Sequence, residues 1–273
     1  MRCAWEKLLS ILPPTVARQL DARDQKSAQE IRLRLGAAPE IHLGSTRRQL
    51  DGRVSQENLT YVLNLASQYS PWCADSLAQG YLTAPGGHRI GVCGEGIFRQ
   101  GQTEGFRSIR SLCVRVARDF PGVGEGLEGI STLIVGAPGW GKTTLLRDLA
   151  RRIAEQETVS VVDERGELFP EGFEIGRHMD ILTGVPKPQG VEMVLKTMGP
   201  AYIAVDEITS EADSLVMLQA ANCGVHLLAT VHGSGLSDLR QRPMYRRLLE
   251  AGVFRQILVL NRDQSYRRER VTI

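Results

Sequence analysis

Residues Gly136 to Thr144 read GAPGWGKTT and fit the pattern G-x-x-x-x-G-K-[ST]. The apolar run STLIV (131–135) precedes this stretch, and TTLLRDLARRIA, which has helical periodicity, overlaps its end. A glycine-rich loop between a strand and a helix turns its backbone N–H groups inward at the positive end of the helix dipole, where anions bind. The stretch therefore predicts a phosphate-binding loop at the start of a nucleotide-binding domain.

The residue types in this loop predict how ATP and Mg²⁺ would be held. Lys142 would place a positive charge beside the β and γ phosphates, and the hydroxyl of Thr143 would be a ligand of Mg²⁺. The expected nucleotide-binding residues are Gly136, Ala137, Pro138, Gly139, Trp140, Gly141, Lys142, Thr143 and Thr144.

Strand-like and helix-like segments alternate through the C-terminal half of the chain. Further apolar runs lie at 158–162, 202–205, 226–230 and 257–260, with helical periodicity between them, as in SLVMLQAA. Such alternation is typical of a parallel sheet covered by helices. We predict an α/β fold over residues 130–273: a five-stranded, doubly wound RecA/AAA-like P-loop NTPase domain with a parallel sheet.

The first part of the chain has a different pattern. EIRLRLG (30–36) alternates apolar and charged residues, and EIHLG (40–44) follows as its hairpin partner. We expect residues 1–118 to form a small α+β N-terminal domain. The stretch DFPGVGEGLEG (119–129) has four glycines and one proline in eleven residues, which predicts a Gly-rich linker.

Two of the apolar runs end in adjacent carboxylates, in VVDERGE (161–167) and in AVDEITS (204–210). The letters DERG match the DxxG motif of GTPases. A GTPase would also need an [NT]KxD motif, but none of the five lysines is followed two places later by Asp. The sequence therefore excludes the GTPase class.

In the other large class of P-loop NTPases, an extra strand separates the P-loop strand from its neighbour, and Asp-Glu ends the third strand. We therefore expect Asp206 to hold Mg²⁺ and Glu207 to be the catalytic base. The next strand ends in Thr230 and His232 and should lie beside the P-loop strand, aiming a polar group at the γ-phosphate. From the residues alone, Asp163-Glu164 is either a second acidic group or an ordinary solvated strand end.

Composition limits the partners and the location. A net charge of +2 gives no sign of a polyanion-binding protein, and five scattered cysteines are typical of reduced thiols in the cytosol. No segment approaches the ~18 apolar residues of a membrane span. Pro13 and Pro14 interrupt the apolar N-terminal stretch, so no signal peptide is expected. We expect a cytoplasmic protein without a transmembrane segment.

The order of these motifs resembles the secretion ATPases of type II and type IV systems. Those motors carry an acidic box on the second strand and a His box on the fourth. The resemblance implies that Glu164 is a second carboxylate near the γ-phosphate and that His232 is the His-box residue. With Glu207, these are the expected catalytic residues.

The chain resembles one family in particular, stage III sporulation protein AA, which is a secretion-type ATPase of endospore-forming bacteria. The resemblance implies an ATP-hydrolysing motor that forms a homo-hexameric ring and works with the membrane complex of a secretion-like channel. It also implies a peripheral position at the mother-cell membrane and no direct contact with nucleic acid. The motifs that carry it are GAPGWGKTTLLRDLAR, VVDERGE, GRHMDILTGVPK, AYIAVDEI, LLATVHG, RPMYRRLLEAGVF, EIRLRLG, GHRIGVCGEG and RSIRSLCVRVAR.

A ring of this type uses the arginines of one subunit to complete the site of its neighbour. The candidates in the N-terminal domain are Arg89, Arg107, Arg110 and Arg115. The chain departs from the family pattern at Lys196, where we expect an arginine, and at Ala201, where we expect an acidic residue.

Two other functions are compatible with parts of the pattern. A RecA-like motor on single-stranded nucleic acid would share the P-loop and Asp-Glu but would need a basic groove with aromatic side chains, and aromatics make up only 5% here. A scaffold that binds nucleotide without hydrolysis would have no use for Asp206 and Glu207.

Overall fold

The computed structural model describes residues 3–70, 73–99 and 101–269. The chain divides into two compact units, one of Met1–Asp119 with Glu171–Phe173, the other of Phe120–Pro170 with Glu174–Ile273. Most of the stretch expected to be a linker (119–129) thus belongs to the second unit. There the carboxylate of Asp148 accepts N–H bonds from Gly122 (3.0 Å) and Gly124 (2.7 Å).

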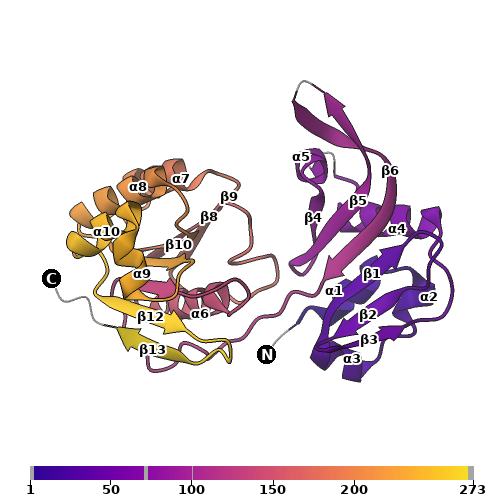
Figure 1. The fold of residues 1–273 in the computed structure, drawn as a ribbon, viewed down its shortest axis with the longest axis horizontal. Coiled ribbons are helices and arrows are strands. Elements are labelled where there is room, and N and C mark those ends of the chain that lie inside the picture. The colour runs from indigo at the N-terminus through magenta and orange to yellow at the C-terminus, as the bar shows by residue number, and fades with distance from the viewer. Residues whose placement is uncertain (1–2, 71–72, 100, 270–273) are drawn as a thin grey trace. The chain divides into compact units, whose positions relative to one another are not determined.

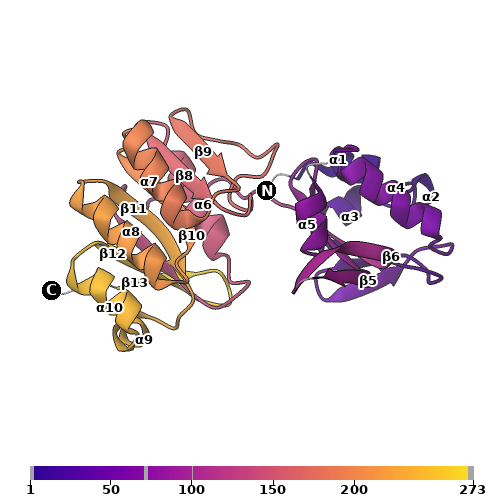
Figure 2. The same cartoon turned by 90° about the horizontal axis from the view of Figure 1, so that it is seen from above.

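The first unit is a six-stranded antiparallel sheet in the order β3-β2-β1-β6-β5-β4, with helices packed on one face (Figure 2). The predicted hairpin is confirmed, because β1 pairs with β2. The elements are α1 (Trp5–Ile11), α2 (Pro14–Ala17), α3 (Ala22–Ser27), β1 (Ala28–Arg34), β2 (Glu40–Leu43), β3 (Thr46–Gln49), α4 (Gln56–Ala66), α5 (Ala74–Ala78), β4 (Tyr81–Ala84), β5 (His88–Arg99) and β6 (Gln102–Arg115).

Alternation along β1 explains how this sheet is covered. Ile31 and Leu33 are fully buried against the helices, whereas Arg32 and Arg34 lie on the opposite, polar face. Successive side chains of a strand point to opposite faces, so a single strand supplies both the core and a charged surface.

The second unit is a seven-stranded sheet in the order β13-β12-β7-β11-β10-β8-β9. All neighbouring strands are parallel except β12 and β13. The elements are β7 (Thr132–Val135), α6 (Lys142–Ile153), β8 (Val159–Asp163), β9 (Met179–Thr183), α7 (Lys187–Thr197), β10 (Tyr202–Glu207), α8 (Glu211–Asn222), β11 (His226–Val231), α9 (Leu236–Gln241), α10 (Pro243–Glu250), β12 (Gln256–Leu260) and β13 (Tyr266–Glu269).

The strand order confirms the predicted fold class, a P-loop ATPase fold built on a parallel-strand sheet. β11 lies beside the P-loop strand β7, as expected, and β10 separates β11 from β8. The prediction of five strands was wrong, because β9 and β13 extend the two edges of the sheet, β13 in the antiparallel direction.

Helices cover both faces of this sheet (Figure 1). α6 packs on one face through Leu145, Leu146 and Leu149, while the other face is covered by side chains from α7, α8, α9 and α10. The central strands are therefore apolar throughout, as in parallel sheets buried on both sides. In the described part of the chain, no helix has both the length and the apolar character of a membrane span.

Candidate functional site

The loop between β7 and α6 has the backbone of an anion-binding site. Gly139 and Gly141 have φ angles of 76° and 94°, in the left-handed region that glycine adopts without strain. Helix α6 begins at Lys142, and no side chain caps its N-terminus. The first backbone N–H groups of the helix are therefore available to an anion, and the helix dipole favours negative charge there.

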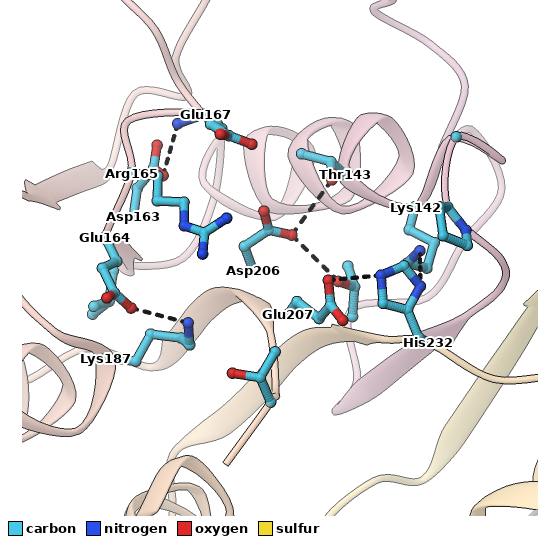
Figure 3. A pocket seen from close by; sticks show the side chains of 15 residues that line it. Lys142, Thr143, Asp163, Glu164, Arg165, Glu167, Lys187, Asp206, Glu207 and His232 are labelled. Atoms are coloured by element: carbon cyan, nitrogen blue, oxygen red, sulfur yellow. Dashed lines mark hydrogen bonds and ion pairs between the residues drawn. The ribbon is translucent and has the colours of Figure 1, made fainter. Parts of the chain in front are cut away.

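The carboxyl ends of β7, β8, β10 and β11 meet in a pocket of about 270 Å³, which Figure 3 shows. Ligands bind at this end of the strands in open α/β sheets. We call it the acidic pocket. Its lining residues are Pro138, Gly139, Lys142, Thr143, Val162, Asp163, Glu164, Arg165, Glu167, Lys187, Asp206, Glu207, Thr209, Thr230 and His232.

A chain of polar contacts joins the phosphate loop to the acid that ends β10. The ammonium of Lys142 donates to the carbonyl of Ala137 and to Nδ1 of His232, each at 3.1 Å. Nδ1 of His232 also lies 3.3 Å from the carbonyl oxygen of Gly136, and its Nε2 lies 3.0 Å from Oε2 of Glu207. His232 therefore holds the carboxylate of Glu207 at the pocket wall.

Asp206 lies deeper in the same pocket. Its Oδ1 accepts from the hydroxyls of Thr143 (3.4 Å) and Thr230 (3.3 Å). Burial raises the pKa of the Asp206 carboxyl, and the nearby charges of Asp163 and Glu207 raise it further. Mg²⁺ prefers oxygen ligands, and it usually takes one or two carboxylates from the protein. The hydroxyl of Thr143 and the carboxylate of Asp206 therefore fit a magnesium ion.

The two carboxylates that end β8 and begin the following loop differ in their surroundings. Asp163 is buried and accepts three backbone N–H bonds, from Glu167 (2.9 Å), Leu168 (2.8 Å) and Phe169 (3.1 Å). Glu164 is exposed, lines the acidic pocket and pairs with Lys187 at 3.0 Å (Figure 3). Both residues line the acidic pocket. The carboxylate of Asp163 is taken up by the backbone of the loop 163–169, whereas Glu164 pairs with the side chain of Lys187.

The whole chain is similar to a known protein family. Residues 4–270 match the family described as sporulation stage III, protein AA. The chain belongs to this family. It is 32% identical over 282 residues to stage III sporulation protein AA of Bacillus subtilis, covering 95% of this chain and 92% of the relative. It is also 31% identical to the uncharacterized protein ycf45 of Porphyra purpurea, covering 96% of this chain but 46% of that longer protein.

Solved structures share the fold of this family member. The ATPase DotB of Legionella pneumophila superposes with a TM-score of 0.63 at 18% identity, covering 94% of this chain and 79% of DotB. The pilus retraction motor PilT, solved with bound ADP, gives a TM-score of 0.59 at 13% identity, covering 88% of this chain and 78% of PilT. At these identities the likeness concerns the fold.

In this family member the pocket also contains two cations that the sequence patterns did not single out. Lys187 begins α7, and its side chain is only 14% exposed. Arg165, in the loop after β8, extends toward the carboxylate of Asp206 (Figure 3). Neither β9 nor the role of Lys187 was predicted from the sequence. The two are connected, because β9 ends at Thr183, four residues before Lys187, and so sets where α7 begins.

Proposed function

We propose that the second unit binds ATP with Mg²⁺ and hydrolyses it. The observation that carries the proposal is the convergence of Lys142, Thr143, Asp206, Glu207 and His232, from three segments of the chain, on one pocket at the N-terminus of α6. An ammonium, a helix N-terminus, a magnesium-type donor set and a positioned carboxylate are together the parts that phosphoryl transfer to water requires.

Each part has a defined task in this proposal. The backbone of the loop 136–144 would bind the β and γ phosphates, and their oxygens would replace Ala137 and His232 as partners of Lys142. Thr143 and Asp206 would hold Mg²⁺, which supplies charge neutralisation at the phosphate oxygens when bound. Mg²⁺ is usually held by one or two carboxylates together with substrate phosphates, and this pocket offers that combination.

Glu207 would be the general base. A water molecule between Glu207 and the γ-phosphate would give its proton to the carboxylate as its oxygen bonds to phosphorus, and the bond from phosphorus to the β-phosphate oxygen would break, leaving ADP and phosphate. His232 would keep Glu207 in position through Nε2. Glu164 would be a second carboxylate that shapes the charge around the γ-phosphate.

At the level of the cell, we propose an ATPase motor of a secretion-like membrane complex during sporulation. The family membership supports the sporulation setting, and the fold shared with DotB and PilT supports a secretion-type motor. In this proposal the protein is a cytoplasmic homo-hexameric ring, docked peripherally on its membrane complex at the mother-cell membrane.

The test separates binding from turnover. Glu207→Gln keeps the shape of the side chain but removes the base, so we expect ATP affinity to stay within a few-fold while phosphate release falls by about 10²- to 10⁴-fold. Lys142→Ala is the companion variant, and it should abolish ATP binding because the loop loses its side-chain charge.

Two results would contradict the proposal. Unchanged phosphate release in Glu207→Gln would remove Glu207 as the base, and unchanged ATP affinity in Lys142→Ala would remove the phosphate loop. Stimulation by single-stranded DNA, without any effect of membrane-complex partners, would favour the nucleic-acid motor instead.

A further inference from the structure

A second cavity borders the same loop and helix as the acidic pocket. Lys142 and Thr143 face the acidic pocket, whereas the residues on either side of them, Gly141 and Thr144, line the second cavity. The two cavities measure about 270 and 260 Å³. Neither alone reaches the range of ~300–1,000 Å³ usual for ligand pockets, but a ligand lying across the start of α6 would occupy both.

The second cavity differs in chemistry from the acidic pocket. None of its lining residues carries a formal charge at neutral pH, and its walls include the aromatic rings of Phe120, Trp140 and Tyr266. Trp140 and Tyr266 also pack against the buried core under α6, which fixes their positions. Aromatic walls of this kind favour a flat, uncharged ring system over a phosphate.

One polar side chain comes to this cavity from the turn between β12 and β13. The turn is held by its own side chains, because Asn261 Nδ2 donates to Ser265 Oγ (2.9 Å) and Ser265 Oγ donates to Asp263 Oδ1 (2.6 Å). Gln264 has a φ of 68°, and its Cγ lies 4.0 Å from the point where a Cβ on Gly141 would stand. The turn therefore holds Gln264 over the phosphate loop, with its side chain exposed.

We propose that this cavity holds the purine base of the nucleotide, with the carboxamide of Gln264 facing the Watson–Crick edge of the base. The inference rests on the proposed ATP binding at the phosphate loop. The phosphates would lie in the acidic pocket, and the base would lie between Phe120, Trp140 and Tyr266.

The chemistry of Gln264 limits how well the site distinguishes ATP from GTP. A carboxamide has one acceptor and one donor end and can rotate. It therefore matches adenine, which offers a donor at N6 and an acceptor at N1, and equally guanine, which offers an acceptor at O6 and a donor at N1. The native protein should bind ATP and GTP with similar affinity.

The first experiment compares ATP with inorganic tripolyphosphate, which has the phosphates but no base, both with Mg²⁺. Tyr266→Ala and Phe120→Ala, two cavity residues outside the phosphate loop, should each weaken ATP by about 5- to 150-fold, the value of one base–aromatic contact, and leave tripolyphosphate within about twofold. Lys142→Ala should weaken both ligands. Equal losses of both ligands in the two aromatic variants would overturn the base assignment.

The second experiment changes the side chain that is proposed to face the base edge, and it leaves the buried core of the protein unchanged. Gln264→Glu leaves only acceptors, which repel adenine N1 but accept from guanine N1–H and N2–H. The preference should shift toward GTP by about 5- to 150-fold. Arg262→Gln is the matched control, because it lies in the same exposed turn, changes the charge by the same amount and does not line the cavity.

The outcomes separate this inference from the proposed function. If the native protein binds tripolyphosphate through Lys142 but binds ATP no more tightly, the base cavity is wrong and the phosphate site stands. An unchanged ratio of ATP to GTP affinity in Gln264→Glu would remove Gln264 from the base edge. If neither ATP nor tripolyphosphate binds, both proposals fail.

Discussion

The adjacent carboxylates Asp163 and Glu164 show how two residues of like chemistry diverge within one peptide. Asp163 is buried, and three backbone N–H bonds converge on its carboxylate. Glu164 reaches the acidic pocket and pairs with Lys187. A strand alternates its side chains between faces, so neighbours at its end enter different environments. The function of the pair therefore has to be tested one residue at a time.

Glu164→Gln should lower ATP turnover by about 10²- to 10⁴-fold if this carboxylate takes part at the γ-phosphate, with ATP affinity little changed. Phosphate release and ATP binding measured on the same preparation check this. Because Glu164 and Glu207 would act on one reaction centre, the double variant should be little worse than Glu207→Gln alone. Turnover within a few-fold of the native rate would show that Glu164 is only a solvated residue at the end of a strand, without a role in hydrolysis.

Asp163→Asn tests whether the neighbouring carboxylate stabilises the fold. The amide keeps one acceptor but replaces the other with a donor that faces backbone N–H groups, so the loop 163–169 loses contacts that its buried groups need. We expect the free energy of unfolding of the second unit to fall by about 1–3 kcal/mol. Denaturant titration measures it, and Glu164→Gln, which is exposed, should leave this stability unchanged.

At the scale of elements, helix α7 depends on one glycine for its close contact with the sheet. A Cβ on Gly190 would lie 2.6 Å from Val162 Cγ1 and 3.3 Å from Leu182 Cδ2. Gly190 thus lets the helix backbone approach β8 and β9, and the same helix presents Lys187 to the acidic pocket. The sequence alone shows only a glycine that weakens a helix.

Gly190→Ala sets two effects against each other. Alanine stabilises a helix relative to glycine by about 1 kcal/mol, whereas overpacking a core costs about 1–3 kcal/mol. Because the new Cβ would lie 2.6 Å from Val162 Cγ1, we expect a cost at the upper end of that range. We expect a net loss of about 1–2 kcal/mol in the free energy of unfolding of the second unit. Gln189→Ala, on the exposed side of α7, should change it by less than about 0.5 kcal/mol. A stabilised Gly190→Ala protein would contradict the packing argument.

At the scale of the whole molecule, the proposed ring needs a cation from a neighbouring subunit. Of the four candidate arginines, Arg107 pairs with Glu95 at 3.0 Å, and Arg89 lies 4.3 Å from the ring centre of Tyr81. Arg110 and Arg115 are exposed on β6, and neither forms an ion pair with another described residue. Arg115 is thus a suitable residue with which to test for contact between subunits.

Arg115→Ala should reduce turnover by about 10³-fold or more if it completes a neighbour's site. Mixing it with the inactive Glu207→Gln protein should restore measurable turnover, because a mixed ring contains interfaces with an intact Glu207 and an intact Arg115. Arg107→Ala is the control, and it should remain active. Light scattering with and without a slowly hydrolysed ATP analogue follows assembly. A strict monomer in both conditions, or no recovery on mixing, would contradict the ring with Arg115 at the interface.

The features that could be predicted from the sequence are local ones. The phosphate loop is a single run of nine residues between a strand and a helix, so its geometry follows from neighbours along the chain. The central strands β7, β10 and β11 are covered on both faces and therefore leave continuous apolar runs. The position of Asp206 and Glu207 at the end of β10 then predicted the order of these strands correctly.

Features that depend on the edges of the sheet, or on contacts between distant segments, could not be predicted from the sequence. β9 and β13 are edge strands with exposed polar residues, so neither has the apolar run that marks a central strand. The second cavity brings Phe120, Trp140 and Gln264 together from separate parts of the chain, and Lys187 reaches the acidic pocket only because β9 ends there. Periodicity reports which face of an element is buried, whereas a site also depends on which elements meet, and that is set by the packing of the whole unit.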